Sequence, residues 1–276
     1  MKRSSLGLLA LLTGSLPGVV RAAADTGARG GPLDLAPYPQ TLVYEADFSR
    51  PLEVVNESEL FEGERRVALP EGREWVLEGE GARAWTEGGR LHLANRTATG
   101  RATHAVLWNT RAFPADFLLE FGFAPADANL GLAIVFFAAR SRAGGGIFDL
   151  ALPARQADFP NYHTGELDCY HVSYWAIDPK GRTRGFANLR KNHGFHVLGD
   201  GADLIAGQGA GPHRVRLLKV GGHIQLEVNG QVALDRRDDG QQFGPVLGGG
   251  AIGLRQMKHS GAGSYTHFKL WEIAAQ

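Results

Sequence analysis

The sequence predicts an all-β protein, an antiparallel sandwich or barrel, and three observations carry this prediction. Glycine is abundant, at 38 of 276 residues, and patterns with a helical period are scarce. Short runs that alternate between apolar and polar side chains recur along the chain, and Gly, Pro, Asn and Asp separate them. Short strands at such regular spacing are typical of packed antiparallel sheets.

The alternating runs give the expected strands in chain order. The near-continuous apolar run Leu130–Ala138 is typical of a buried central strand. Gly221-Gly222 and Asn229-Gly230 each predict a tight hairpin turn. The expected strands are Thr41–Phe48, Arg90–Ala94, Phe117–Phe123, Leu130–Ala138, Tyr170–Trp175, Gly185–Arg190, Arg214–Val220, His223–Val228, Ala251–Arg255 and Tyr265–Ile273.

The first 24 residues are expected to be a cleaved secretory signal. Lys2 and Arg3 precede an apolar run, Leu6–Leu12, and small residues around Ala22 offer a cleavage site. The run is too short to span a bilayer comfortably. We therefore expect a secreted or periplasmic protein with no membrane partner after cleavage. Residues 25–40 are expected to be a flexible leader, and residues 41–276 one sandwich domain.

The charge balance argues against a nucleic-acid-binding protein, and the cysteine content excludes a protein stabilised by internal disulfides. The chain has 29 basic and 29 acidic residues, and removal of the signal with its three basic residues leaves a formal charge of −3. Nucleic-acid binders normally show a basic excess, so no nucleic-acid partner is expected. Cys169 is the one cysteine, which excludes an internal disulfide. A lone cysteine is more often a small buried apolar residue than a nucleophile. The oligomeric state is not predicted.

Polar and aromatic residues from three expected strands share one face. Val172, Leu189 and Leu254 suit the core, and alternation about them places the neighbouring side chains on the opposite side of the sheet. That opposite face consists of His171, Ser173, Trp175, Phe186, Asn188, Arg190 and Arg255. Rings combined with donors of this kind are typical of a surface that binds a sugar.

An ordered series of motifs, from about residue 46 to the C-terminus, resembles the YesU-like family, a domain of unknown function within the concanavalin A-like lectin/glucanase superfamily. The resemblance implies a jelly-roll β-sandwich of two antiparallel sheets with a concave groove that faces carbohydrate. It also implies a part in the degradation of acidic plant or algal polysaccharides, including rhamnogalacturonan-type pectins, but no agreed mechanism. The motifs are Phe136–Ala139, Tyr162–Gly165, His171–Tyr174, Asn188–Lys191, Gly194–His196, Asp238–Gly240, Gly244–Gly248 and Ile252–Met257.

The residues of this groove favour β-elimination on an acidic poly- or oligosaccharide. Elimination needs a group that neutralises the uronate carboxylate, and a guanidinium binds a carboxylate bidentately. It also needs a base and an acid, roles that histidine and tyrosine can fill. Tyr174 shares its alternation with the inward-facing Val172. The predicted catalytic residues are His163, His171, Arg190 and Tyr174. The predicted substrate-binding residues are Trp108, Ser173, Trp175, Asn188, Lys191, Arg255 and Glu166.

Two alternatives stay open at this point. A glycoside hydrolase of the same fold would use Glu166 and Asp168, which project from one face if the strand begins before them. A non-catalytic, lectin-like module would use the rings of Trp108, Trp175 and Phe186 as stacking platforms. Trp108 suits the core equally well.

No catalytic metal or other cofactor is expected. Four histidines lie between residues 163 and 196, but none has the His-x-x-x-His or Cys-His spacing of a zinc site. Asp238-Asp239-Gly240 offers oxygen ligands for a structural calcium ion. The same three residues are equally the pattern of a hairpin turn.

Overall fold

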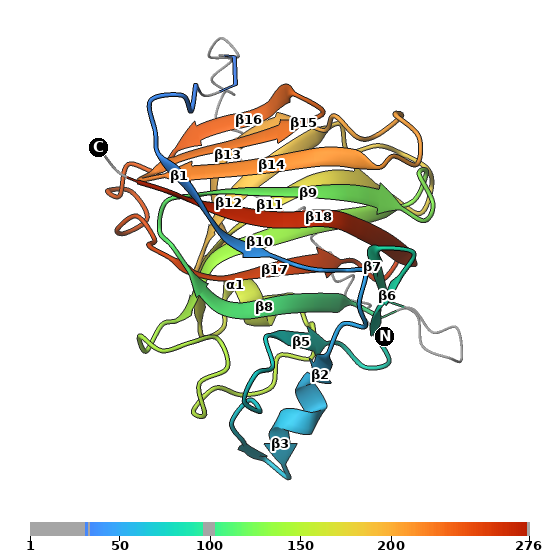
Figure 1. Ribbon diagram of the computed structural model, residues 1–276, viewed down its shortest axis with the longest axis vertical. Coiled ribbons are helices and arrows are strands. Elements are labelled where there is room, and N and C mark those ends of the chain that lie inside the picture. The colour runs from blue at the N-terminus through green and yellow to red at the C-terminus, as the bar shows by residue number, and fades with distance from the viewer. Residues whose placement is uncertain (1–30, 33, 96–102, 275–276) are drawn as a thin grey trace, which may run out of the picture.

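The computed structural model describes residues 31–32, 34–95 and 103–274, and two stacked sheets account for most of them (Figure 1). The expected signal and the first part of the expected leader lie outside the described residues. The prediction of a jelly-roll sandwich is confirmed.

Sheet A has eight strands, with β1 joined to the edge of β18 by antiparallel pairing. The other seven strands follow one another across the sheet in the order β16-β15-β14-β9-β18-β7-β6. Their bounds are β1 (Gln40–Glu45), β6 (Arg83–Glu87), β7 (Arg90–Ala94), β9 (Phe117–Pro125), β14 (His213–Val220), β15 (His223–Val228), β16 (Gln231–Arg237) and β18 (Ala262–Ile273).

Sheet B also has eight strands, in the order β13-β12-β11-β10-β17-β8-β5-β2. Its pairs are antiparallel except for β2 and β5, which run parallel. The bounds are β2 (Val54–Asn56), β5 (Trp75–Glu78), β8 (Ala105–Phe113), β10 (Gly131–Ser141), β11 (Leu167–Ile177), β12 (Phe186–Asn192), β13 (His196–Ala202) and β17 (Gly250–Gln256).

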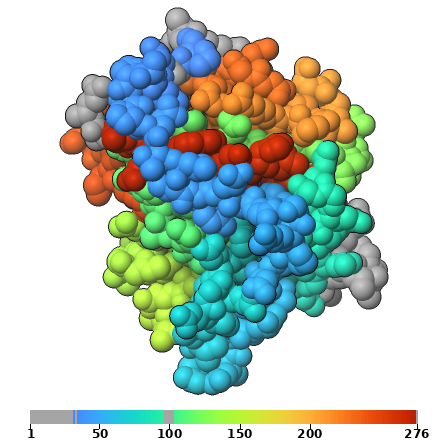
Figure 2. All heavy atoms as spheres, in the orientation of Figure 1, coloured from blue at the N-terminus to red at the C-terminus, as the bar shows by residue number. Residues whose placement is uncertain are grey.

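Four short elements lie outside the two sheets. They are η1 (Glu57–Leu60), the two-stranded ladder of β3 (Phe61–Glu62) and β4 (Arg65–Arg66), and the helix α1 (Pro160–His163). The segment that contains β2, η1 and β3 protrudes at the lower end of the molecule (Figure 2). None of the helices in the described part of the chain is long and apolar enough to cross a bilayer.

The core lies between the sheets and follows the predicted alternation. Val172, Leu189 and Leu254 are each at most 1% exposed and belong to one apolar cluster with side chains of sheet A. The predicted hairpin turns are also present, with positive φ at Gly221, Asn229 and Gly230. Burial of each large apolar side chain contributes roughly 1.5–3 kcal/mol to the stability of the sandwich.

A long connection covers part of the other face of sheet B, which we call the outer face. Residues 142–166 join β10 to β11, and Ile147, Leu152 and Tyr162 from this connection pack on Trp108 and Phe136 of the sheet. The side chains beneath it are buried. The connection therefore covers part of the face on which a concave groove was expected.

Candidate functional site

The covered end of the outer face holds a fully buried ionic network. Glu78 at the end of β5 is 0% exposed, and its Oε1 accepts hydrogen bonds from Arg155 Nε at 2.9 Å and Arg155 Nη2 at 2.5 Å. The Tyr162 hydroxyl donates to the other carboxylate oxygen. Glu57 accepts from the backbone N–H of Arg155 and forms an ion pair with Arg66 at 3.1 Å. Each cation here has a carboxylate partner, so this end is structural.

His171 lies on the same face, in the middle of β11, and is 2% exposed. Its ring centroid is 5.5 Å from that of Phe136 and 5.8 Å from those of Phe159 and Phe195. Its Nδ1 lies 2.9 Å from Asn192 Nδ2. An apolar cage of three rings thus surrounds one imidazole.

The electrostatic surroundings of His171 are basic. Burial, followed by the guanidinium groups of Arg190 and Arg255, lowers the pKa of His171 from 6.5 to about 3, and Arg184 acts in the same direction. The pKa of His163 is also lowered, by burial and then by Arg190 and Arg255. Both imidazoles are therefore neutral at pH 7 and lie in a field that attracts anions.

His163 is the last residue of α1, so the end of the covering connection brings it to His171. Its ring lies 4.6 Å from that of Phe195 and 4.9 Å from that of Phe159. The backbone N–H of Gly194 donates to the His163 carbonyl at 2.7 Å, which ties α1 to the loop between β12 and β13.

Arg190 belongs to β12 and is paired with His171 in the register of β11 and β12. Its Nη1 donates to the carbonyl of Phe195 at 2.8 Å, and its guanidinium lies 3.8 Å from the centroid of the same ring. No ion pair joins Arg190 to any residue in the described ranges. The ring holds the guanidinium in place. Burial lowers the pKa of Arg190, and the carboxylate of Asp200 acts in the opposite direction without forming an ion pair with it.

Arg184 follows the hairpin after β11, and backbone and hydroxyl acceptors fix its position. Its Nη1 donates to Ser173 Oγ and its Nη2 to the Ser173 carbonyl, both at 2.8 Å, while Nε donates to the Phe186 carbonyl at 2.7 Å. Asp200 and Asp203 are near enough to raise its pKa, although burial prevails and lowers it. Neither carboxylate forms an ion pair with it within the described part of the chain.

Arg255 of β17 marks the boundary between the covered and open parts. It is 0% exposed, its Nη1 donates to the Ala157 carbonyl at 2.9 Å, and its guanidinium lies between 4.9 and 5.2 Å from the ring centroids of Phe159 and Tyr162. Nε and Nη2 have no hydrogen-bond partner among the residues described. Two buried donors on a cation are costly unless a ligand or water meets them. We call Arg184, Arg190, Arg255, His163 and His171 the basic strip.

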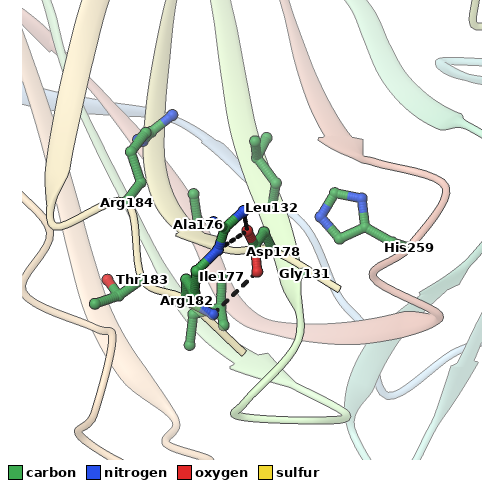
Figure 3. A pocket seen from close by; sticks show the side chains of 9 residues that line it. All are labelled: Gly131, Leu132, Ala176, Ile177, Asp178, Arg182, Thr183, Arg184 and His259. Carbon is green, nitrogen blue, oxygen red and sulfur yellow. Dashed lines mark hydrogen bonds and ion pairs between the residues drawn. The ribbon is translucent and has the colours of Figure 1, made fainter. Parts of the chain in front are cut away.

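A pocket of about 450 Å³ adjoins the basic strip at Arg184. Figure 3 shows Arg184 on one side, His259 on the other, and Leu132 and Ala176 between them. At its edge Arg182 and Asp178 form an ion pair, with Nη2 and Oδ2 2.6 Å apart. The volume lies in the range of small-ligand sites. The pocket and the basic strip share Arg184.

Two predicted groove residues lie in the core instead. Between Ser173 and Trp175 the ladder with β10 shifts register, so a bulge at Tyr174 turns Trp175 inward as well. Trp175 is 1% exposed and packs 5.7 Å from Phe123, and Tyr174 is 0% exposed at 5.5 Å from the same ring. The placement of Trp175 on the groove face was therefore wrong, and Tyr174 is not positioned to meet a ligand.

Lys191 also lies on the inner side. It alternates with Arg190, and its Nζ donates to Asp238 Oδ2 at 2.7 Å and to the carbonyls of Gly244 and Pro245. The prediction that Lys191 binds substrate is contradicted by this buried ion pair. Tyr170 donates to the same carboxylate oxygen, so Asp238 closes a turn in the manner that Asp-Asp-Gly also predicts.

Glu166 and Asp168 do not reach the basic strip. Leu167 and Cys169 occupy the outer face at this end of β11, so the two carboxylates between them point the other way. Glu166 precedes the strand and is exposed. The hydrolase alternative therefore loses the paired carboxylates on which it depended.

The remaining predicted residues share the expected face. Ser173 and Asn188 are cross-strand partners next to Arg184 and Arg190. Trp108 is on this face but fully buried, 5.4 Å from Phe136 and 6.2 Å from Tyr162, under the covering connection. It is therefore a packing residue and not an accessible platform.

Several residues of the site come from loops, and alternation does not signal their positions. They include Phe159, Arg184, Phe195 and His259. Arg184 had one usable signal, since it directly precedes the expected strand Gly185–Arg190. Within the described ranges there is no group of three or more His, Cys, Asp or Glu side chains with the geometry of a metal site.

Comparison with known proteins gives one family. The model of the domain of unknown function DUF1961 matches residues 65–270. The uncharacterized protein YesU of Bacillus subtilis is 35% identical over 191 residues, which are 67% of this chain and 83% of that protein.

Solved structures agree with the family match. A crystal structure from Bacillus subtilis, described as a protein of unknown function with a galectin-like fold, is similar at a TM-score of 0.71 and 29% identity, over 87% of this chain and all of that one. A carbohydrate-binding module from Bacillus subtilis has a TM-score of 0.46 and 12% identity, over 71% of this chain and 93% of the module, which is too distant to bear on function.

Proposed function

This chain belongs to the DUF1961 family, and we propose that it binds an acidic poly- or oligosaccharide on the outer face of sheet B and cleaves it by β-elimination. The observation that carries the proposal is the basic strip itself. Arg190 and Arg255 lie beside two neutral histidines, and the charged groups that shift the pKa of each histidine are all basic. Asp200 near Arg190, and Glu78 and Asp158 near Arg255, act on these cations without a direct ion pair. A uronate carboxylate would supply the direct ion pair that both guanidinium groups lack among the described residues.

The neighbouring side chains favour a sugar over a simple anion. Half-buried rings of Phe159, Phe186 and Phe195 lie beside Ser173 and Asn188, so apolar surfaces and hydrogen-bonding groups alternate over a short distance. A sugar ring presents the same combination of apolar faces and hydroxyl groups. The pocket beside Arg184 extends the surface beyond one ring, which favours an oligomeric ligand.

The chemistry follows from charge neutralisation. When guanidinium groups hold the carboxylate, the C5 hydrogen of the uronate becomes more acidic. A neutral base takes that proton, the electrons form the C4–C5 double bond, and the bond from C4 to the glycosidic oxygen breaks. The leaving oxygen takes up one proton, from the protonated base or from water, and departs as a hydroxyl group. His163 is neutral at pH 7 and stands beside Arg190 and Arg255, so we assign the base to it.

We also propose that the protein acts outside the cytoplasm. The basic start and apolar run within residues 1–24 support export through a cleaved signal. Sequencing the N-terminus of the protein recovered from a culture of an expressing bacterium tests this, and an intact Met1 would contradict it.

The test of the activity follows ultraviolet absorbance and reducing ends together, on uronate polymers such as polygalacturonate and alginate and on neutral dextran. Elimination predicts that both signals rise with an acidic polymer. Reducing ends without new absorbance would overturn elimination, and binding without either signal would overturn cleavage. Absence of binding to every acidic polymer would overturn the proposal as a whole.

A matched pair of variants links the activity to the site. Arg190→Gln removes a charge from the basic strip, whereas Arg214→Gln removes one from an exposed ion pair with Glu120 in sheet A. We expect only Arg190→Gln to reduce turnover and affinity.

A further inference from the structure

We propose that Cys169 and Asn192 hold His171 in the tautomer with its proton on Nε2, so that His171 donates a hydrogen bond to a ligand oxygen and is not the base. The role of His171 toward a ligand rests on the proposed function, but its tautomer is a property of the free protein. It assigns positioning roles to two buried residues that no step of elimination uses directly.

Among the described residues, the thiol of Cys169 has one hydrogen-bond acceptor, a backbone carbonyl. This side chain is 0% exposed, and its Sγ lies 3.8 Å from the backbone carbonyl of Tyr162, to which the thiol donates. Burial raises the pKa of Cys169 to about 12, so the thiol keeps its proton. A thiol has a single proton, and the carbonyl uses it. Any further partner of Sγ must therefore be a donor.

The next link is the side-chain amide of Asn192, which lies 3.3 Å from Cys169 Sγ through its Nδ2. If the amide were flipped, its oxygen would face a sulfur that has no second proton to give. The flip would also leave two buried N–H groups without acceptors, whereas the present orientation leaves only Oδ1 unpaired. Two unpaired buried donors cost more than one unpaired acceptor.

The orientation of Asn192 then determines the tautomer of His171. The second N–H of the amide points to His171 Nδ1 at 2.9 Å, so Nδ1 must be the acceptor. In a neutral imidazole the other nitrogen then carries the proton. His171 Nε2 forms no hydrogen bond with any residue in the described ranges, and it is the nitrogen left for a ligand.

This assignment divides the roles of the two histidines. A ring with a proton on Nε2 can bind an acceptor such as a carboxylate or glycosidic oxygen, but it cannot take a proton there. The base of the proposed elimination is thus His163, and His171 orients or polarises the group that it contacts. The ligand must place an oxygen lone pair, not a donor hydroxyl proton, against His171.

The test is a two-bond ¹⁵N–¹H correlation spectrum of histidine-labelled protein at neutral pH, with His171 assigned by its loss in His171→Gln. We expect the pattern of protonation on Nε2. A wild-type spectrum with the proton on Nδ1 would overturn the inference without reference to any ligand.

Two cysteine variants test how the tautomer is held. Cys169→Ser keeps a donor and an acceptor at the same place and should leave the spectrum unchanged. Cys169→Ala removes both, so the amide of Asn192 can flip, and a mixture of tautomers is expected. If the spectrum of Cys169→Ala shows His171 protonated on Nε2 alone, the cysteine has no part in fixing the tautomer.

Asn192→Asp should reverse the preferred tautomer of His171, because a carboxylate accepts a hydrogen bond from Nδ1–H. We expect the His171 proton to move to Nδ1 and the affinity for a uronate oligosaccharide to fall about tenfold or more, as for the loss of one hydrogen bond to a charged group. Unchanged affinity together with a moved proton would overturn the donor role. If the wild-type tautomer is as expected but no acidic saccharide binds, the proposed function fails and the assignment stands.

Discussion

The two ends of the outer face of sheet B contain similar side chains but use them differently. At the covered end, Arg155 lies against Glu78, and both side chains are almost completely buried. At the open end, Arg184 and Arg190 donate to carbonyl or hydroxyl oxygens and have no carboxylate partner within the described residues. Most of residues 142–166 pack over the first end, and the last part of this connection, with Phe159 and His163, reaches the second end.

The difference indicates which cations serve folding. A buried guanidinium that is paired with a carboxylate, such as Arg155 with Glu78, fixes residues 142–166 on sheet B. Removal of the carboxylate leaves an uncompensated buried charge. A guanidinium held by neutral acceptors has no direct ion pair to lose, and under the proposed function its charge is available to a ligand. Arg255 lies between the two cases, since one nitrogen binds a carbonyl and two remain unpaired.

The largest expected effect comes from breaking the covered end. Glu78→Gln leaves Arg155 as a buried charge without its counterion, and we expect the free energy of unfolding to fall by about 3–5 kcal/mol. Denaturant titration at neutral pH measures this. The double variant Glu78→Gln with Arg155→Met should recover much of the loss. Equal losses in the single and double variants would contradict the importance of the pair.

The next effect concerns affinity and not stability. Arg190→Lys keeps the charge but loses the planar fork that matches a carboxylate. We expect the binding free energy for a uronate oligosaccharide to weaken by about 1.5–3 kcal/mol, a loss of affinity of roughly ten- to 150-fold. The free energy of unfolding should change by less than about 1 kcal/mol, because Arg190 is only half-buried and has no ion pair to lose. Calorimetry and denaturant titration on the same samples compare the two quantities. A large loss of stability without loss of affinity would place Arg190 with the structural cations.

A third prediction uses the cage of rings around His171. Its pKa is about 3 in the folded protein, because of burial and then Arg190 and Arg255, against 6.5 in an unfolded chain. As the pH falls below 6.5 the unfolded state binds a proton that the folded state does not. The free energy of unfolding therefore falls by about 1.4 kcal/mol per pH unit from this residue.

His171→Gln should remove that slope. Between about pH 7 and pH 5 we expect wild type to lose about 2 kcal/mol more stability than the variant. Denaturant titrations at both pH values measure the difference. Parallel losses in the two proteins would mean that the folded state accommodates the protonated ring.

Alternation predicted the part of the site that lies on regular strands. His171, Ser173, Asn188 and Arg190 share the outer face because each is separated from the next on its strand by one core residue. The same rule, applied strictly, would have placed Lys191 inward. The inward orientation of Trp175 was not predicted, because one extra residue in a bulge reverses the faces of the residues after it. No residue type in the segment marks the bulge.

The rest of the site depends on the course of loops. The rings of Phe159 and Phe195 reach His171 because α1 and the turn after β12 dock on each other through Gly194 and His163. Local sequence does not encode such docking, which depends on packing between segments far apart in the chain. The covering by residues 142–166, and with it the burial of Trp108, was unpredictable for the same reason.

The smallest expected effect distinguishes the pocket from the basic strip. Ala176 lines the pocket and lies between Arg184 and His259 (Figure 3), so Ala176→Leu fills space without removing charge. If the pocket holds a second ring, affinity for a longer oligosaccharide should fall by about 1 kcal/mol, roughly fivefold, while the shortest ligand that binds should be unaffected. Lys180→Ala, on the same hairpin but outside the pocket lining, is the control. An equal loss for short and long ligands would mean that the pocket and the strip bind a single ring together, and no loss for either would remove the pocket from the site.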